Sequence, residues 1–177
     1  HAARLLPVRQ HGEPAMLKLS HEPNERLGGI VMAWWDGDGA ARVLARDGKA
    51  LLLERAMGAA SLSDIARTGR DDEACRILCA TAERLHARRA KPRPDLTPLR
   101  DWFRALWPAA RAHGGILNRS ADTAEALLGD PREIVVLHGD LHHDNVLDFG
   151  PPGWPPHRPQ PLDGGRRIGL PNHVPTP

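Results

Sequence analysis

The sequence has no long apolar stretch and no clear excess of either charge. No apolar run approaches the roughly 20 residues that a membrane-spanning helix needs, and the start lacks the basic-then-apolar pattern of a signal peptide. Lysine and arginine total 24 against 22 acidic residues, and no basic cluster stands out. A polyanion partner normally requires positive charge gathered on one face, so we expect neither a membrane nor a nucleic acid as partner.

Cysteine is also scarce, and the two present, Cys75 and Cys79, lie four residues apart in a segment with helical periodicity. On a helix this spacing puts both side chains on one face but points them along it, which suits a disulfide poorly. Thiols that stay reduced indicate a reducing compartment. We therefore expect a cytoplasmic protein whose two cysteines pack in the core.

The first part of the chain has the patterns of strands and turns. Its 177 residues allow one ordinary domain or two small lobes. Apolar stretches on either side of residues 11–14 predict two strands, and Asp47-Gly48 predicts a hairpin turn between two more. Between these pairs, residues 24–35 predict a helix capped by Asn24.

From about residue 61 the period changes to that of helices. An apolar stripe predicts a helix over residues 74–85, and a second helix is expected to begin with Thr97 as its cap and Pro98 in its first turn. A third helix is expected over residues 122–128, and residues 134–137 predict a short buried strand that leads into a polar loop. Strands followed by helices indicate an α+β fold, and we find no internal repeat.

The end of the chain differs in composition. Nine of the last 27 residues are proline, against eight in the first 150. Such a segment supplies few ladder hydrogen bonds and buries too little apolar surface to offset the entropy of ordering it. Residues 151–177 are therefore expected to form a disordered tail.

The polar loop after the predicted strand carries Asp140 and Asn145 at the D-x-x-x-x-N spacing of kinase catalytic loops. A carboxylate at this place can accept or orient the proton of an attacking substrate hydroxyl. An amide oxygen one turn later can bind Mg²⁺ without adding negative charge beside the phosphates. The spacing favours phosphoryl transfer, with Asp140 as the catalytic carboxylate and Asn145 as a magnesium ligand.

The histidines of this loop allow another interpretation. His138, His142, His143 and Asp144 could suggest a zinc or iron site. They lack the helix-borne H-x3-H frame of such sites, however, so a metal hydrolase is disfavoured.

The whole loop, residues 137–147, resembles that of aminoglycoside phosphotransferases, in particular the branch with streptomycin 6-phosphotransferases and hydroxyurea phosphotransferases. The resemblance covers about residues 5–150. Its other matching segments, in order, are Pro14-Ala15-Met16-Leu17-Lys18, Trp34-Trp35-Asp36-Gly37, Gly39-Ala40-Ala41-Arg42-Val43, Leu51-Leu52-Leu53-Glu54-Arg55-Ala56, Asp71-Asp72-Glu73-Ala74-Cys75, Leu85-His86-Ala87 and Pro131-Arg132-Glu133.

The resemblance implies a protein-kinase-like two-lobed α+β fold, incomplete at both ends because the chain opens on His1 rather than Met and departs from the family after its catalytic hairpin. Residues 1–56 would form a partial β-rich nucleotide-binding lobe and hinge. Residues 57–150 would form the helical lobe with the catalytic loop, and residues 151–177 the tail.

The resemblance also implies roles in nucleotide binding. Lys18 would pair with the phosphates of ATP, and Glu25 would hold its ammonium in place, although Glu22 lies near. Backbone groups of Glu54 and Ala56 would meet the adenine edge at the hinge. The cofactors implied are ATP and Mg²⁺.

The chain departs from the family after the catalytic loop. Asp148-Phe149-Gly150 spells the magnesium-binding tripeptide of protein kinases but lies only three residues after Asn145, so we expect a hairpin turn there. Relatives continue with an Ile-Asp-Pro strand whose Asp chelates Mg²⁺, whereas this chain has His157-Arg158-Pro159. If these are encoded CAT-CGA-CCN, reading one base later gives Ile-Asp-Pro. Likewise, Ile168-Gly169-Leu170-Pro171, if encoded ATT-GGA-CTA-CCN, gives Leu-Asp-Tyr one base later, which is similar to the Phe-Asp-Tyr of relatives. We hypothesise that residues after about Trp154 are a frameshifted translation.

The resulting expectation is ATP-dependent phosphoryl transfer to a hydroxyl of a streptomycin-type aminoglycoside, a small-molecule antibiotic, which would confer resistance. Without the second metal ligand the activity should be very low. Exposed apolar faces on the helical lobe should also lower stability or cause aggregation. The alternatives are hydroxyurea as acceptor, a non-catalytic remnant that binds nucleotide, and a kinase for choline or homoserine with the same fold. The acceptor and the oligomeric state stay open.

Overall fold

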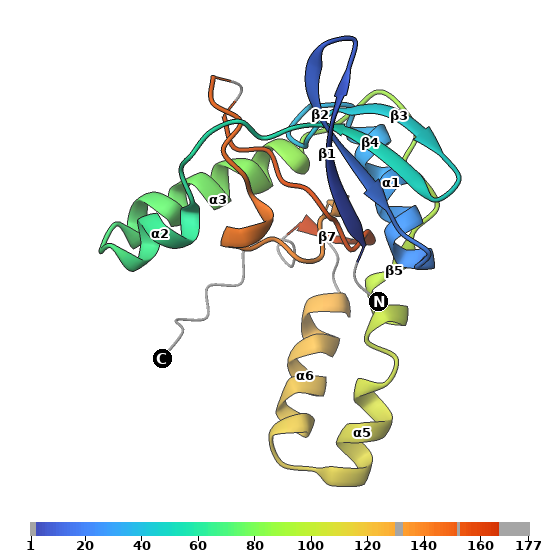
Figure 1. Cartoon of the computed structure of the whole chain (residues 1–177). Coiled ribbons are helices and arrows are strands. Elements are labelled where there is room, and N and C mark those ends of the chain that lie inside the picture. Colours follow the sequence, from blue (N-terminus) through green and yellow to red (C-terminus); the bar gives the residue numbers. More distant parts are fainter. Residues whose placement is uncertain (1–2, 130–132, 152, 167–177) are drawn as a thin grey trace.

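The computed structural model describes residues 3–129, 133–151 and 153–166, and its first part is an antiparallel sheet with one helix (Figure 1). The strands pair in the order β1-β2-β4-β3. The elements are β1 (Arg4–Gln10), β2 (Glu13–Leu19), α1 (Pro23–Trp35), β3 (Val43–Asp47) and β4 (Ala50–Glu54). Both predicted hairpins are confirmed. The second turn lies one residue later than predicted, because Asp47 pairs with Ala50 and leaves Gly48 and Lys49 as the turn.

Helix α1 confirms the helix predicted between the two hairpins. The prediction of Asn24 as its cap is wrong, because the helix begins at Pro23 and Glu22 is the N-cap residue, with no side-chain capping bond. Proline has a fixed φ that suits the first helical position, so it starts the helix one residue earlier. The helix ends where Asp36 adopts a left-handed conformation with φ 55° and donates its N–H to the carbonyl of Met32.

The second part is mainly helical. Its helices are α2 (Leu62–Arg67), α3 (Asp71–Leu85), α4 (Leu99–Trp102), α5 (Leu106–His113) and α6 (Ile116–Gly129). Helix α3 is confirmed, and α6 is longer than predicted. Thr97 is not a helix cap, because Thr97 and Pro98 form the short strand β5 and Pro98 is the N-cap residue of α4. The helix predicted from there breaks near Phe103 into α4 and α5.

A second, small sheet lies next to the polar loop that contains Asp140 and Asn145. Strand β6 (Ile134–Leu137), as predicted, pairs antiparallel with β7 (Leu162–Gly165), and β7 pairs in parallel with β5. The expectation of a wholly disordered tail is wrong for β7. Six of the nine prolines precede this strand in the sequence and three follow it, and the strand itself contains none, so its ladder is not interrupted. Residues 168–171, which are part of the frameshift hypothesis, lie outside the described residues. The division into domains at residues 56 and 150 stays a prediction.

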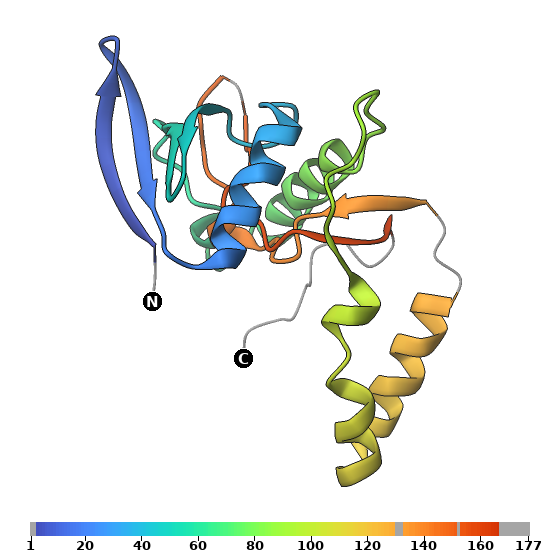
Figure 2. The ribbon, with the colours of Figure 1, turned by 90° about the vertical axis from the view of Figure 1, so that its right-hand side faces the viewer.

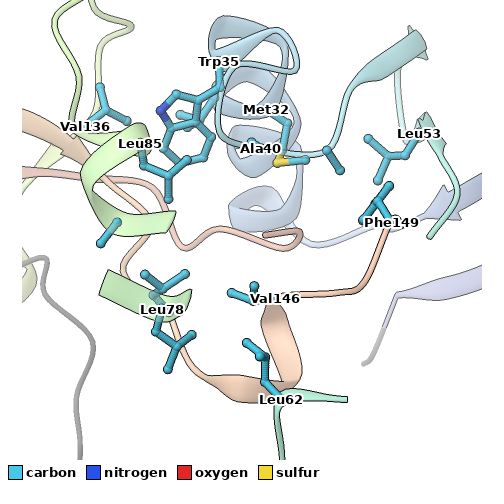
Figure 3. Packing of buried hydrophobic residues seen from close by; sticks show 14 of the residues in the cluster. Met32, Trp35, Ala40, Leu53, Leu62, Leu78, Leu85, Val136, Val146 and Phe149 are labelled. Atoms are coloured by element: carbon cyan, nitrogen blue, oxygen red, sulfur yellow. The ribbon is translucent and has the colours of Figure 1, made fainter. Parts of the chain in front are cut away.

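The main core joins the two parts of the chain (Figure 3). Met32 and Trp35 from α1, Leu53 from β4, Leu78 from α3 and Val146 after the catalytic loop belong to one buried cluster. A smaller cluster of Leu99, Leu137 and Leu162 lies under the second sheet. Figures 1 and 2 both show the α5–α6 hairpin extending away from the rest.

The cysteines lie on α3 and form no disulfide. Cys75 is half-buried and Cys79 is exposed, so the expectation of core packing is wrong for Cys79. Among the described residues, no helix is long and apolar enough to cross a membrane.

Candidate active site

Lys18 lies on β2 and forms an ion pair with Glu25 in the first turn of α1, as the resemblance implied. The Lys18 side chain is 6% exposed and that of Glu25 is 21% exposed. Burial lowers the pKa of Lys18, and the hydrogen bond and charge of Glu25 oppose that shift. Glu25 thus favours the charged form of a buried ammonium, the form that binds phosphate oxygens.

Asp140 and Asn145 are joined directly by hydrogen bonds. Strand β6 leads into Asp140, and Asn145 ends the 3₁₀ turn His143–Asn145. The Asn145 Nδ2 donates to the backbone oxygen of Asp140 at 2.8 Å and to its Oδ2 at 2.9 Å. Asn145 is buried, whereas the Asp140 side chain is 46% exposed. The arrangement holds Asp140 in a fixed orientation and leaves its carboxylate accessible to a substrate hydroxyl.

The His138 side chain packs in the protein interior. It is buried and stacks on Trp35, with ring centroids 6.3 Å apart. Burial lowers its pKa to about 3, so the ring is neutral near pH 7, and its Nε2 lies 3.3 Å from the carbonyl oxygen of His157. Within the described ranges, no group of three or more His, Cys, Asp or Glu residues is placed to hold a metal ion.

The segment after the catalytic hairpin, residues 157–160, packs against both halves of the site. The backbone N–H of His157 donates to the carbonyl of Asn145 at 2.9 Å, and that of Gln160 donates to the carbonyl of His138 at 2.7 Å. A Cβ on Gly139 would lie 2.0 Å from the Gln160 oxygen. The Nη2 of Arg158 lies 3.7 Å from Glu25 Oε1. The two predicted residue pairs are therefore linked, from Lys18 through Glu25 to this segment and on to Asn145.

Comparison with known proteins identifies the family. The model of the family described as aminoglycoside/hydroxyurea antibiotic resistance kinase matches residues 1–177. The chain belongs to this family.

Two curated relatives are similar to this chain over part of their own length. It is 52% identical over 177 residues to a streptomycin 3''-kinase of Klebsiella pneumoniae, covering all of this chain and 66% of the relative. It is 32% identical over 176 residues to a streptomycin 6-kinase of Streptomyces griseus, covering 92% of this chain and 55% of the relative. The chain thus spans less than two thirds of the length of these relatives.

Solved structures confirm the kinase-like α+β fold. An ethanolamine kinase of Plasmodium vivax matches with a TM-score of 0.62 at 15% identity, over 94% of this chain and 56% of that one. An aminoglycoside-3'-phosphotransferase of type VIII matches with a TM-score of 0.60 at 20% identity, over 95% of this chain and 71% of that one. At these identities the similarity concerns the fold.

The kinase tripeptide Asp148-Phe149-Gly150 lies in a hairpin turn, as predicted. Val146 bridges Pro156 across the hairpin, and the Phe149 N–H donates to the carbonyl of Gly153 at 3.0 Å. The Asp148 carboxylate accepts from the N–H of Gly150 at 2.8 Å and from that of Ala60 at 3.1 Å. Asp148 therefore connects the turn to the segment that follows β4.

The predicted hinge residues, Glu54 and Ala56, lie at the end of β4 and two residues beyond it. The Glu54 N–H donates to the carbonyl of Arg42 at 3.0 Å, and its Oε1 accepts from the Arg42 N–H at 2.7 Å. Ala56 is half-buried against the main core. Binding of adenine by their backbone groups stays a prediction.

Arg158 is the site residue that the sequence did not predict as one. It lies where the family resemblance places the magnesium-binding Asp, and the only signal was that the motif is broken there. Asn145 is then the single predicted magnesium ligand in this network, and a guanidinium belongs to the same network. The described residues therefore do not fit a magnesium site of the family's kind.

Proposed function

We propose that this chain forms the nucleotide and catalytic part of an ATP-dependent kinase that phosphorylates a hydroxyl of streptomycin. The observation that supports the proposal best is the hydrogen-bonded pair of Asp140 and Asn145, linked through residues 157–158 to the ion pair of Lys18 and Glu25. Two curated relatives are named for streptomycin, and the family description includes hydroxyurea, which is the alternative acceptor.

The roles follow from charge and exposure. The accessible Asp140 carboxylate would accept or orient the proton of the acceptor hydroxyl, while Asn145 fixes its direction. Lys18 would hold phosphate oxygens of ATP. We assign no step to Mg²⁺, because the described residues do not fit it, and we expect slow transfer for the same reason.

The test measures streptomycin-dependent phosphate transfer from ATP by the chain and by its Asp140→Asn variant. We expect the variant to be slower by about 10²- to 10⁴-fold, the usual contribution of a positioned acid–base group. Thermal melting shows whether the variant is folded. Equal rates for the two folded proteins would contradict the proposal.

A non-catalytic remnant that binds nucleotide is the second candidate. Arg158 favours it, because a cation stands where the family resemblance places a metal-binding carboxylate. Undiminished ATP binding together with streptomycin phosphorylation no faster than that of Asp140→Asn would select this candidate. A cytoplasmic location stays a prediction from the two thiols.

A further inference from the structure

Two cations share one carboxylate at the centre of the site. Glu25 pairs with Lys18 through Oε2, and its Oε1 lies 3.7 Å from Nη2 of Arg158. The Lys18 ammonium is buried, whereas the Arg158 side chain is 44% exposed. The three residues carry one net positive charge, and much of the guanidinium remains accessible to a ligand.

The backbone around Arg158 is held by its neighbours. Arg158 adopts φ 65°, a left-handed conformation that is costly for a residue with a side chain and persists where the surroundings enforce it. His157 and Gln160, on either side, both donate backbone hydrogen bonds to the catalytic-loop segment. A Cβ on Gly28 of α1 would lie 3.0 Å from the Pro159 oxygen. The backbone that carries the guanidinium is therefore anchored beside the Lys18–Glu25 pair.

This charge distribution suits an anion and opposes a divalent cation. Arg158 adds positive charge where a metal-binding carboxylate would add negative charge, so Coulomb repulsion weakens the binding of Mg²⁺. Guanidinium groups bind phosphate oxygens in a bidentate geometry. The contact of Arg158 with Glu25 is long, so Arg158 can turn to a phosphate while Lys18 keeps its partner.

We propose that Lys18 and Arg158 form a polyphosphate site that binds ATP without a divalent metal, with Glu25 as their shared counter-ion. Arg158 supplies the positive charge that the family resemblance assigns to Mg²⁺. The inference rests on the proposed nucleotide site and goes beyond it in naming the form of ATP that the chain binds. It concerns the protein that carries Arg158, and it holds for that protein whether or not the Arg158 codon arose by a frameshift.

The experiment is calorimetric titration of the full chain with ATP, and separately with inorganic tripolyphosphate, in EDTA and in excess Mg²⁺. We expect both ligands to bind in EDTA at least as tightly as in Mg²⁺. Arg158→Gln should weaken binding in EDTA by about tenfold or more, because a charge-assisted contact is lost. Arg158→Lys, which keeps the charge and loses the fork geometry, should lie between the two.

Two further variants complete the comparison. Arg158→Asp should weaken binding in EDTA further and make ATP binding depend on Mg²⁺. The exposed Arg67, which pairs only with Asp64 among the described residues, provides the control Arg67→Gln, with binding expected to be unchanged.

The outcomes separate this inference from the proposed function. Binding of ATP in Mg²⁺ but not in EDTA would overturn the inference and leave the proposed function standing. Equal affinities of Arg158→Gln and Arg67→Gln in EDTA would also overturn it. If the chain binds ATP neither in EDTA nor in Mg²⁺, both the inference and the proposed function are overturned.

Discussion

Lys18 shows at the scale of one residue how the site depends on charge compensation. Its ammonium is buried, and Glu25 opposes the lowering of its pKa. Lys18, Glu25, Asp140 and Asn145 could be named from the sequence, because their residue types and motif spacing are fixed by the chemistry of phosphate and hydroxyl groups. Arg158 could not, because it departs from the motif and its meaning depends on a contact with α1 that only the fold creates.

Replacing Glu25 with Gln should destabilise the protein. The substitution leaves the Lys18 ammonium buried without its counter-ion, so we expect a loss of about 2 kcal/mol in the free energy of unfolding, below the range for fully buried pairs because Glu25 is partly exposed. Urea unfolding measures it. Asp64→Asn breaks the exposed pair with Arg67 and is the control, with a change within about 0.5 kcal/mol. Equal effects would contradict this account of the pair.

Three histidines with lowered pKa values predict loss of stability in mild acid. Burial lowers the pKa of His86 and that of His157 to about 4 and the pKa of His138 to about 3, against the ordinary value of 6.5. Between about pH 6.5 and 4 the unfolded chain binds these protons and the folded chain does not, so stability falls as pH falls. Each histidine contributes at most about 1.4 kcal/mol per pH unit.

Urea unfolding at pH 7 and pH 5 measures this dependence. His86→Leu should make the dependence less steep, because one of the three groups with a lowered pKa is removed. A matched His113→Leu change at an exposed position tests for a general effect of removing a histidine. A His86→Leu protein with an unaltered pH dependence would show that burial of His86 is not its source.

At the scale of elements, the sequence predicts those helices and strands whose signals lie within a few neighbouring residues. The β1–β2 and β3–β4 hairpins, α3 and β6 follow from periodicity and turn residues. Strand β7 was missed because its pairing is non-local: Leu162 pairs with Thr97 and Leu137, distant in sequence. The high proline content is an average over residues 151–177. It does not reveal that the four residues of β7 contain no proline.

Residues 157–160 pack closely on the loop that contains Asp140. This packing predicts that alanine destabilises the protein more at one glycine than at another. Gly139 and Gly150 have nearly equal φ angles, +74° and +76°, so alanine strains the backbone similarly at both. Only at Gly139 would the new Cβ meet another atom, 2.0 Å away at Gln160, whereas nothing lies within 4 Å at Gly150.

We therefore expect Gly139→Ala to lower the free energy of unfolding by roughly 2 kcal/mol more than Gly150→Ala, the typical cost of overpacking. Urea unfolding of the two variants, side by side, measures the difference. Equal losses would mean that residues 157–160 do not lie against the loop.

At the scale of the whole molecule, the α5–α6 hairpin extends from the body (Figure 2). It carries an apolar hollow of about 560 Å³. Its lining includes Phe103, Leu106 and Leu128, and Ile116 and Leu127 are among the most exposed large apolar residues described. The fold class could be predicted because the catalytic motif identifies it. The hairpin's extension could not, because α6 was expected to be shorter and the break near Phe103 was not foreseen.

This exposed apolar surface predicts self-association at high protein concentration. The double variant Ile116→Glu and Leu127→Glu should shift sedimentation toward the monomer. Ile30→Glu, at an exposed apolar position on α1 outside this hairpin, is the control and should leave the distribution unchanged. Identical sedimentation of all three proteins would show that the hairpin surface does not drive association.

The central claim is that Lys18 faces the phosphates of ATP. The chain has only three lysines, Lys18, Lys49 and Lys91, so a reagent selective for lysine amines gives an unambiguous map. An acyl phosphate of ATP carries its reactive carbonyl on the γ-phosphate and transfers the acyl group to a nearby amine, releasing ATP.

Peptide mapping by mass spectrometry after labelling is the direct test. We predict that Lys18 is acylated fastest and is protected by excess ATP, while Lys49 and Lys91 react slowly and without protection. Labelling of Lys18 no faster than the other two lysines, or labelling that ATP does not suppress, would contradict the claim.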